Sequence, residues 1–263
     1  KALIKKCADV IQNDTIEMND KMLFDFRLFV NKSVNMSRGN LLKVNNPDLT
    51  EESLEYLLCL IKYPKDNIIQ VHFTGDFNFK NIKERNICQI LLSIIYFLPN
   101  ILSFSLSECK NITANLKNTL LYTIPRLPAL KILNLEGDLL GDDFIKTLSD
   151  VIANKNLIAL FLGNNNITNS GGFFIPTILS KTKIERLFIA KNHINQNGLS
   201  TLLSAIQSIK KVNGLDLNDN DFSMEDFEVL AEFLKTNPDL KYLNIGKNIK
   251  PDTNPQTIQK SRT

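Results

Sequence analysis

Apolar residues recur along the chain in one frame, which returns at intervals of 27 to 33 residues. In each copy the first, fourth and sixth places are apolar, and the ninth place holds asparagine or a substitute. Apolar residues two places apart are typical of a short strand with one buried face. Seven copies begin at Ile68, Ile101, Leu130, Leu157, Ile184, Val212 and Leu240. The chain is therefore predicted to be a repeat array.

Behind each predicted strand the apolar spacing changes to three or four residues, which predicts a helix. Phe144 and Leu148 share one such helical face. Asp142 and Asp143 stand where this helix begins, so helix capping and the helix dipole explain their carboxylates better than catalysis does. Pro176 interrupts another predicted helix and is expected to delay or bend it, because proline has no N–H group.

The two ends of the chain depart from the repeat. An eighth, degenerate copy of the frame begins near Gly39, with Leu42 and Val44 in its apolar places and Pro47 where asparagine is expected. Residues 1–38 are apolar but outside the frame, and they are predicted to form an N-terminal helical cap. The domain organisation is thus a cap at 1–38, seven to eight repeats at 39–250, and a polar C-terminal tail at 251–263.

The frame Leu-x-x-Leu-x-Leu-x-x-Asn-x-Leu, read best from Leu157 to Ile167, resembles leucine-rich repeats. Spacings of 27 to 29 residues with a helix in each repeat are similar to the ribonuclease-inhibitor-like class. This resemblance implies an α/β solenoid shaped as a horseshoe, with a parallel sheet on the concave face and helices on the convex face. It also implies that the ninth-place asparagines hydrogen-bond the turn backbone between repeats. Those asparagines are Asn165, Asn192, Asn220 and Asn248, whereas Asp76, Cys109 and Asp138 depart from the pattern.

Composition narrows the possible environments and partners of the chain. The net charge is only +3, and no stretch of sequence forms a basic footprint, so nucleic acid is not an expected partner. The longest apolar stretch, from Ile87 to Leu98, is shorter than the roughly 20 residues of a membrane-spanning helix, so no membrane partner is expected either. The four cysteines form no CxxC pair, and they predict reduced thiols and a cytoplasmic location. Cys59 and Cys88 fall on neighbouring helices and are expected to be two buried thiols rather than a disulfide.

Residues with catalytic chemistry are sparse. The two histidines, His72 and His193, lie several repeats apart, so the sequence predicts neither a metal site nor a cysteine–histidine dyad. His72 is expected to be a solvated surface residue. No phosphate-binding glycine motif is present, and the chain is predicted to have no cofactor, no metal, no catalytic residue and no enzymatic activity.

The third, fifth and seventh places of each frame are predicted to face the concave groove, because alternate side chains of a strand point to opposite sides. Two phenylalanines occupy neighbouring fifth places, and leaving each ring exposed forgoes about 1.5–3 kcal/mol of burial. A tightly curled horseshoe, or the cap folded over the rings, would cover them instead. The predicted partner-binding residues are Phe161, Phe188, Arg186, Tyr242, Ile132, Glu136, Asp216 and Lys191.

The predicted function is a non-catalytic module, monomeric when free, that binds a protein partner through its concave face. The ribonuclease-inhibitor resemblance implies that such binding inhibits an enzyme. One alternative is a GTPase-activating protein similar to the Ran GTPase activators, which would require an essential arginine such as Arg186. Another alternative is the sensor fragment of a larger receptor. The Lys, Asn and Ile bias is also similar to that of effectors delivered into host cytosol by intracellular bacteria, in which case the partner is a host protein or another effector.

Overall fold

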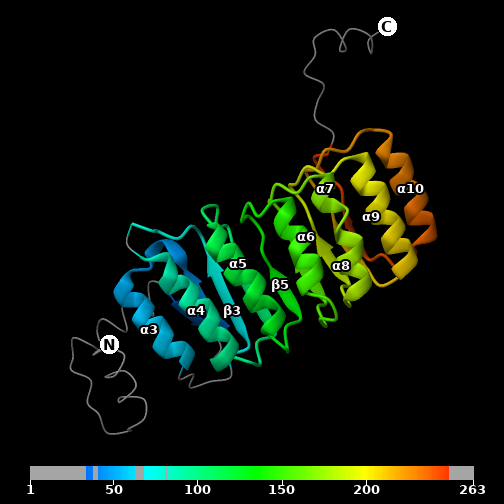
Figure 1. The fold of residues 1–263 in the computed structure, drawn as a ribbon. Helices are drawn as coiled ribbons and strands as arrows, with labels where there is room; N and C mark the ends of the chain where they lie inside the picture. The colour runs from blue at the N-terminus through cyan, green and yellow to red at the C-terminus, as the bar shows by residue number, and fades with distance from the viewer. Residues whose placement is uncertain (1–33, 38–40, 63–67, 81, 249–263) are drawn as a thin grey trace, which may run out of the picture.

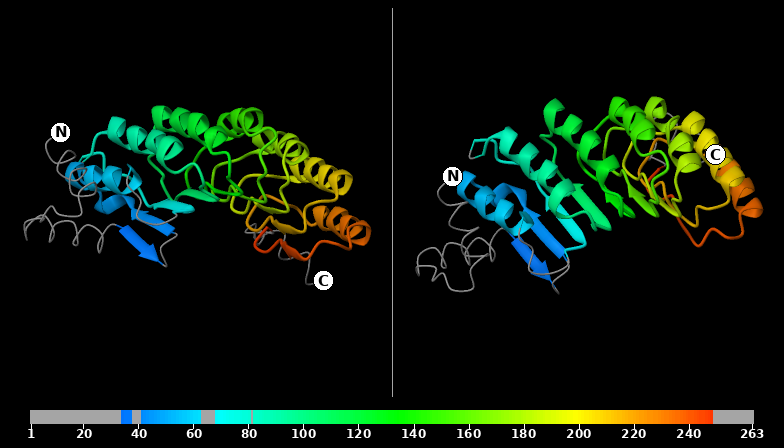
Figure 2. Two further views of the ribbon diagram at one scale, coloured as in Figure 1. Left: turned by 90° about the horizontal axis from the view of Figure 1, so that it is seen from below. Right: turned by 60° about the horizontal axis from the view of Figure 1, so that its bottom comes forward.

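The computed structural model describes residues 34–37, 41–62, 68–80 and 82–248 of the 263-residue chain. From residue 41 onward one strand and one helical segment alternate along the described chain, and consecutive repeats lie side by side (Figure 1). The repeats form a shallow arch, with strands on its inner side and helices on its outer side (Figure 2).

The strands form a single nine-stranded sheet in which the spatial order follows the sequence order. Strands β2 to β9 are parallel, and β1 pairs with β2 in the antiparallel direction. The strands are β1 Val34–Ser37, β2 Leu41–Asn45, β3 Gln70–Thr74, β4 Ser103–Ser107, β5 Ile132–Asn134, β6 Ala159–Phe161, β7 Arg186–Phe188, β8 Gly214–Asp216 and β9 Tyr242–Asn244. The degenerate copy near Gly39 therefore contributes a strand, β2, whose Leu42 and Val44 are fully buried.

Helices return the chain from the end of each strand to the start of the next one. They are α3 Glu51–Lys62, α4 Glu84–Phe97, α5 Ala114–Thr123, α6 Asp142–Val151, α7 Asn169–Gly172, α8 Ile175–Lys181, α9 Gln196–Ile209 and α10 Asp226–Thr236, with 3-10 turns η1 Asn46–Asp48 and η2 Ile124–Arg126. The irregularity expected around Pro176 is present, because the helical segment is split into α7 and α8 and Pro176 lies in the first turn of α8. The core between sheet and helices consists of fourth- and sixth-place side chains such as Leu133 and Leu135, both fully buried.

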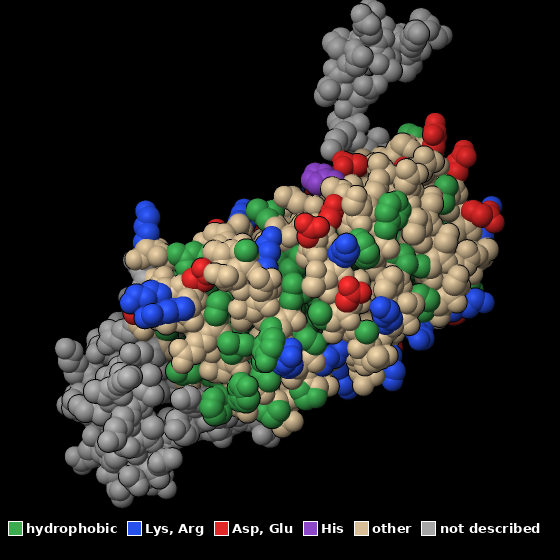
Figure 3. Space-filling view, in the orientation of Figure 1, with side chains coloured by type: hydrophobic (Ala, Val, Ile, Leu, Met, Phe, Trp, Pro, Cys, Tyr) green, Lys and Arg blue, Asp and Glu red, His purple; other side chains and the backbone are tan. Residues whose placement is uncertain are grey.

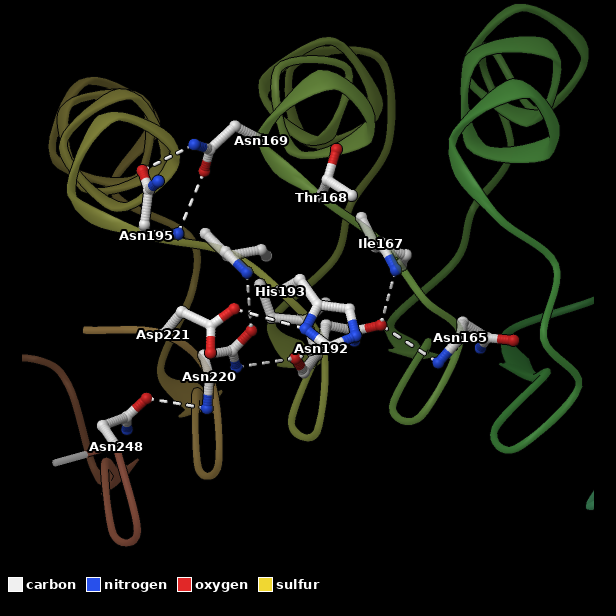
Figure 4. Close-up of polar contacts among 12 residues, drawn as sticks. Asn165, Ile167, Thr168, Asn169, Asn192, His193, Asn195, Asn220, Asp221 and Asn248 are labelled. Atoms are coloured by element: carbon white, nitrogen blue, oxygen red, sulfur yellow. Dashed lines mark hydrogen bonds and ion pairs between the residues drawn. The ribbon is translucent and has the colours of Figure 1, made fainter. Parts of the chain in front are cut away.

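The asparagine column forms an inter-repeat hydrogen-bond ladder, as the resemblance implied (Figure 4). The backbone N–H of Asn165 donates to Oδ1 of Asn192 at 3.0 Å, and that of Asn220 donates to Oδ1 of Asn248 at 2.8 Å. The side-chain amide of Asn165 in turn donates to the carbonyl of Leu135 at 2.6 Å in the preceding repeat. These buried amides satisfy backbone groups that the turns would otherwise leave unpaired.

The ladder changes in the first half of the chain, where the column lacks asparagine. Asp138 is buried and accepts a hydrogen bond from the backbone N–H of Cys109 at 2.9 Å. Asp76 is exposed instead. The buried side chain of Asn46, from the preceding repeat, donates to the carbonyl of Gly75 at 2.6 Å. The first repeats are thus held by a different set of polar contacts.

A second ladder, which the sequence did not predict, runs along the N-terminal ends of the helices. The first residue of a helix accepts hydrogen bonds from the N-cap residue of the next repeat's helix. Its pairs are Glu51 with Lys83, Glu84 with Thr113, Asp142 with Thr168 and Asn169 with Asn195. In the third pair both the N–H and the hydroxyl of Thr168 donate to the carboxylate, at 2.8 and 2.6 Å. Asp142 is therefore structural, but it caps the helix of the next repeat rather than its own.

The predicted terminal segments are largely outside the described residues, as is the whole 251–263 tail. The only described residues of the predicted helical cap are Val34–Ser37. They form strand β1 rather than a helix, because they pair with the free side of β2.

No described helix is both long enough and apolar enough to cross a membrane. The repeat frame, the parallel inner sheet and the outer helices together make the chain an α/β leucine-rich repeat solenoid.

Candidate binding surface

The concave face is built from the third and fifth places of successive strands, which the sheet register aligns in two rows. One row is Ile132, Ala159, Arg186, Gly214 and Tyr242, and the other is Asn134, Phe161, Phe188, Asp216 and Asn244. The register thus brings together, on one face, six of the eight residues predicted to contact a partner.

The two phenylalanine rings stack face to face. The ring centroids of Phe161 and Phe188 are 4.4 Å apart and their planes differ by 1°. Tyr242 extends this stack, with its ring centroid 6.2 Å from that of Phe188 at an angle of 44°. Each phenylalanine is half-buried rather than fully exposed, because each ring covers one face of the other. We call Ile132, Phe161, Phe188 and Tyr242 the aromatic patch.

Gly214, which is not among the predicted partner-binding residues, allows the patch to extend across β8. Tyr242 on β9 and Phe188 on β7 flank the strand that carries Gly214, so a larger side chain there would come between them. A Cβ atom at position 214 would also lie 3.1 Å from Cγ of Arg186. Gly214 lies in a hollow of about 430 Å³ that is bordered by Arg186, Phe188 and Tyr242, and on its other side by Glu185, Asn213 and Lys241. The sequence signal for this hollow was a glycine in the third place of the frame, where the neighbouring repeats carry a side chain.

Most polar residues of the fifth place have a local structural role. Oδ1 of Asn134 accepts a hydrogen bond from the N–H of Glu136 at 2.9 Å, two places further on. In the same way Asp216 accepts a hydrogen bond from the N–H of Asn218 at 3.0 Å, and Asn244 accepts one from the N–H of Gly246 at 3.3 Å. These side chains close the turn that ends each strand. Phenylalanine cannot supply this acceptor, so repeats four and five give up a hydrogen bond in favour of an aromatic ring.

Of the four charged residues predicted to contact a partner, two lie beside the aromatic patch and two do not. Asp216 lies beside the patch, and its Oδ2 atom also accepts from Nδ2 of Asn244 at 3.2 Å and from the hydroxyl of Tyr242 at 3.5 Å. Arg186 is exposed. Glu136 is half-buried one row away from the patch. Lys191 is exposed and lies in the turn after β7, three residues beyond the end of the strand, with a φ of 55°.

The histidines and cysteines form no reactive cluster within the described residues. His72 is half-buried rather than solvated, and its Nε2 lies 3.3 Å from the hydroxyl oxygen of Ser103. Burial, together with the charge of nearby Lys43, lowers the pKa of His72. Cys88 and Cys109 are free thiols, and Cys88 is half-buried rather than buried. In the described part of the chain, His, Cys, Asp and Glu side chains nowhere gather in a group of three or more that could hold a metal ion.

Comparison with known proteins yields partial similarities. No family model matches the sequence. A stretch of 125 residues, 46% of this chain, is 30% identical to FERM domain-containing protein C of Dictyostelium discoideum, and the match spans 8% of that protein's length. Among solved structures, TLR13 in complex with ssRNA13 is similar over 73% of this chain and 23% of that one, with 17% identity and a TM-score of 0.43. An internalin, inlF of Listeria monocytogenes, is similar over 97% of this chain and 91% of that one, with 13% identity and a TM-score of 0.31.

Proposed function

We propose that this chain is a non-catalytic protein-interaction module that docks one protein partner on the aromatic patch. The observation that carries the proposal is the stack of Phe161 on Phe188 in the two repeats that forgo the fifth-place acceptor. Asparagine or aspartate at those positions would strengthen the local turn, as Asn134 and Asp216 do. Phenylalanine there weakens the turn and leaves apolar surface facing solvent, so a role outside folding accounts for it.

The chemistry of the patch fits the centre of a protein interface. Aromatic and arginine side chains surrounded by polar groups dominate the binding energy of such interfaces. Tyr242 and Ile132 are 46% and 39% exposed, so a partner would remove substantial apolar area from water. Arg186 and Asp216 lie beside the rings and would fix the partner's orientation, with Glu136 and Lys191 further out. A single patch with charges of both signs favours one specific protein over a generic polyanion.

Docking in the groove would cover part of the partner's surface, so we propose that binding inhibits an enzyme, as in the ribonuclease-inhibitor-like class. A GTPase activator would instead need Arg186 to reach a nucleotide held by its partner. Arg186→Lys separates the two: it keeps the charge, and it should weaken docking modestly but remove GTPase stimulation almost entirely. We also propose a reducing, cytoplasmic setting, including the cytosol of a host cell, and a monomeric free state.

The test replaces both phenylalanines by the residue found in the same place of other repeats. The Phe161→Asn, Phe188→Asn double variant restores the turn acceptor of Asn134 and Asn244, so it should fold at least as stably as the wild type. We expect affinity capture from lysate to lose its principal partner with this variant, and the purified complex to weaken at least a hundredfold, since each ring contributes 1.5 kcal/mol or more.

The matched control is the Phe173→Asn, Met224→Asn variant. Both of these residues are exposed, at 48% and 67%, and neither belongs to a strand of the concave face. This control variant removes a similar apolar area, and we expect it to retain the partner. If the two variants capture the same proteins as the wild type, while circular dichroism shows all three folded, the groove is not the binding surface.

A further inference from the structure

One edge of the solenoid is formed by the segments that lead from each helix into the next strand. Backbone hydrogen bonds join these segments side by side: Lys131 N–H donates to the carbonyl of Leu102 at 2.8 Å and Ile158 N–H to that of Lys131 at 2.7 Å. The series continues through Glu185, Asn213 and Lys241. Residues far apart in the sequence therefore stand in one row, which we call the helix-end edge.

Basic residues that are far apart in the sequence lie close together along the helix-end edge. Between α5 and β9 its basic residues are Arg126, Lys131, Lys155, Lys181, Lys183, Lys210, Lys211, Lys235 and Lys241, and its acidic residues are Asp150, Glu185 and Asp239. All of these cations except the half-buried Lys155 are exposed. Figure 3 shows blue side chains following the lower edge of the molecule, while red ones gather at the opposite edge. The excess on this edge is larger than the net charge of +3 of the whole chain.

Only some of these basic residues have a stabilising role in the fold itself. A basic residue near a helix C-terminus is stabilising, which accounts for Lys181, Lys210 and Lys235. Lys235 also pairs with Glu232 at 2.9 Å. Lys131, Lys183, Lys211 and Lys241 come after the helices, and none of these four forms an ion pair with a described residue. Like charges placed in one row repel each other, so this second set is a cost to the folded state that an anionic partner would relieve.

Exposed aromatic side chains continue the same edge toward the N-terminus. Tyr96 is 75% exposed and Phe97 is 40% exposed at the end of α4, and Tyr122 is 46% exposed at the end of α5. The guanidinium of Arg126 lies 3.5 Å from the centroid of the Tyr122 ring. In Figure 3 a group of green side chains lies on the lower edge directly beside the blue row. The edge thus joins an aromatic part to a basic part.

We propose that the helix-end edge docks on the surface of a membrane that contains anionic lipids. Tyrosine rings favour the level of the lipid headgroups, where the apolar body and the polar hydroxyl are both accommodated. Lysines along the same plane would lie against the headgroup phosphates and carboxylates, which attract basic residues within a Debye length. Such binding is peripheral, so it needs no membrane-spanning helix.

The arrangement favours a lipid surface over a nucleic acid. Sites for single-stranded nucleic acid place aromatic rings along the groove that holds the backbone, so that each base stacks as its phosphate is neutralised. Here Tyr96, Phe97 and Tyr122 gather on α4 and α5, whereas Lys183 and Lys211 lie in later repeats. Only at Lys241, which precedes the exposed Tyr242, does a lysine without an ion pair among the described residues stand next to an exposed ring. The edge is made by the segments that precede the strands, so it adjoins the concave face, and Lys241 borders the same hollow as Phe188 and Tyr242. This proposal does not depend on the proposed function, because vesicle binding is measured without any protein partner.

Sedimentation of the whole chain with vesicles tests the proposal. We expect binding to vesicles of phosphatidylcholine with about 30% phosphatidylserine, weak or no binding to phosphatidylcholine alone, and a steep loss of binding as salt is raised. Lys183→Gln with Lys211→Gln should lower the partition coefficient about thirtyfold, since each lysine contributes about fivefold. Tyr96→Ser should lower it further without a change in the melting temperature.

The matched control is the Lys110→Gln, Lys247→Gln variant. It removes the same charge from exposed positions on the opposite edge. Vesicle binding should be retained with this control. Equal loss with both double variants would show a general effect of net charge and would overturn the proposal. Failure of the wild type to bind anionic vesicles would overturn it as well, and so would binding to polyuridylate in place of vesicles, which would identify the edge as a nucleic-acid site.

Discussion

Asp138 places a carboxyl group in a column where later repeats carry an amide. Its Oδ1 accepts the Cys109 N–H, but its Oδ2 has no hydrogen-bond partner among the described residues. At the same point of the next repeat, Nδ2 of Asn165 donates to the carbonyl of Leu135. Only a protonated carboxyl group could donate in that way. Burial, together with the charges of Glu108, Asp76 and Glu136, raises the pKa of Asp138 to about 8, against the lowering effect of the Cys109 hydrogen bond.

A stability difference that depends on pH follows at this residue. The unfolded chain releases the proton of Asp138 near its ordinary pKa of 3.8, whereas the folded chain keeps it until about pH 8. Between these values the unfolded state binds fewer protons, so the contribution of Asp138 to the free energy of unfolding falls as pH rises. Asp138→Asn should remove this slope and stabilise the protein at pH 8 by about 1–3 kcal/mol, because the amide can donate without a proton to lose.

Urea denaturation at pH 5 and pH 8 measures this effect. The comparison is between the two proteins at each pH, so that the titration of groups distant from Asp138 cancels. The gain from Asp138→Asn should be larger at pH 8 than at pH 5. An equal gain at both values would mean that Asp138 is already ionised in the folded protein.

At the scale of elements, the second ladder ties the start of each helix to its neighbour. Asp142 accepts two hydrogen bonds from Thr168, so its loss should destabilise the junction between α6 and α7. We expect Asp142→Ala to lower the free energy of unfolding by about 0.5–2 kcal/mol, the usual cost of a lost cap. Asp143→Ala is the matched control, because Asp143 is exposed in the same first turn and experiences the same helix dipole.

Thermal denaturation of the two alanine variants separates the two explanations of these carboxylates. If the helix dipole were the main effect, both variants would lose similar stability. If the bonds to Thr168 dominate, only Asp142→Ala will have a clearly lower melting temperature. A Thr168→Ala change made on top of Asp142→Ala should then add only the loss of the hydrogen bond that the Thr168 hydroxyl accepts from the Ser170 N–H, since its hydrogen bond to Asp142 is already gone.

The sequence predicts elements well where the signal is local. Apolar residues two places apart predicted the position of every strand from β3 to β9. They could do so because both apolar residues of each copy lie in the strand itself or directly after it. The stack of Phe161 on Phe188 followed from their common place in the frame, but its coplanar geometry and its extension over Gly214 did not. Both depend on side-chain contacts between repeats. The second ladder was missed for the same reason, since Asp142 and Thr168 are 26 residues apart and neither position looks unusual alone.

At the scale of the whole molecule, a solenoid converts residues spaced by one repeat into a continuous surface. Lys183 and Lys211 are 28 residues apart in the sequence, yet they belong to adjacent segments of one edge. A search for basic runs along the sequence finds nothing here, and the small net charge hides the separation of charge between the two edges. The aromatic patch and the helix-end edge therefore both result from the repeat, and they adjoin each other at Lys241 and Tyr242.

The same architecture predicts how stability is distributed along the chain. Each repeat contacts only its neighbours, so a central repeat is covered on two sides and a terminal repeat on one. Leu243 and Ile245 of the last described repeat are half-buried, whereas Leu160 and Leu187 are fully buried. Hydrogen exchange followed by mass spectrometry should therefore find the slowest amides in β6 and β7 and the fastest among the strands in β9. Uniform protection from β3 to β9 would contradict this gradient and would mean that the solenoid unfolds as a single cooperative unit.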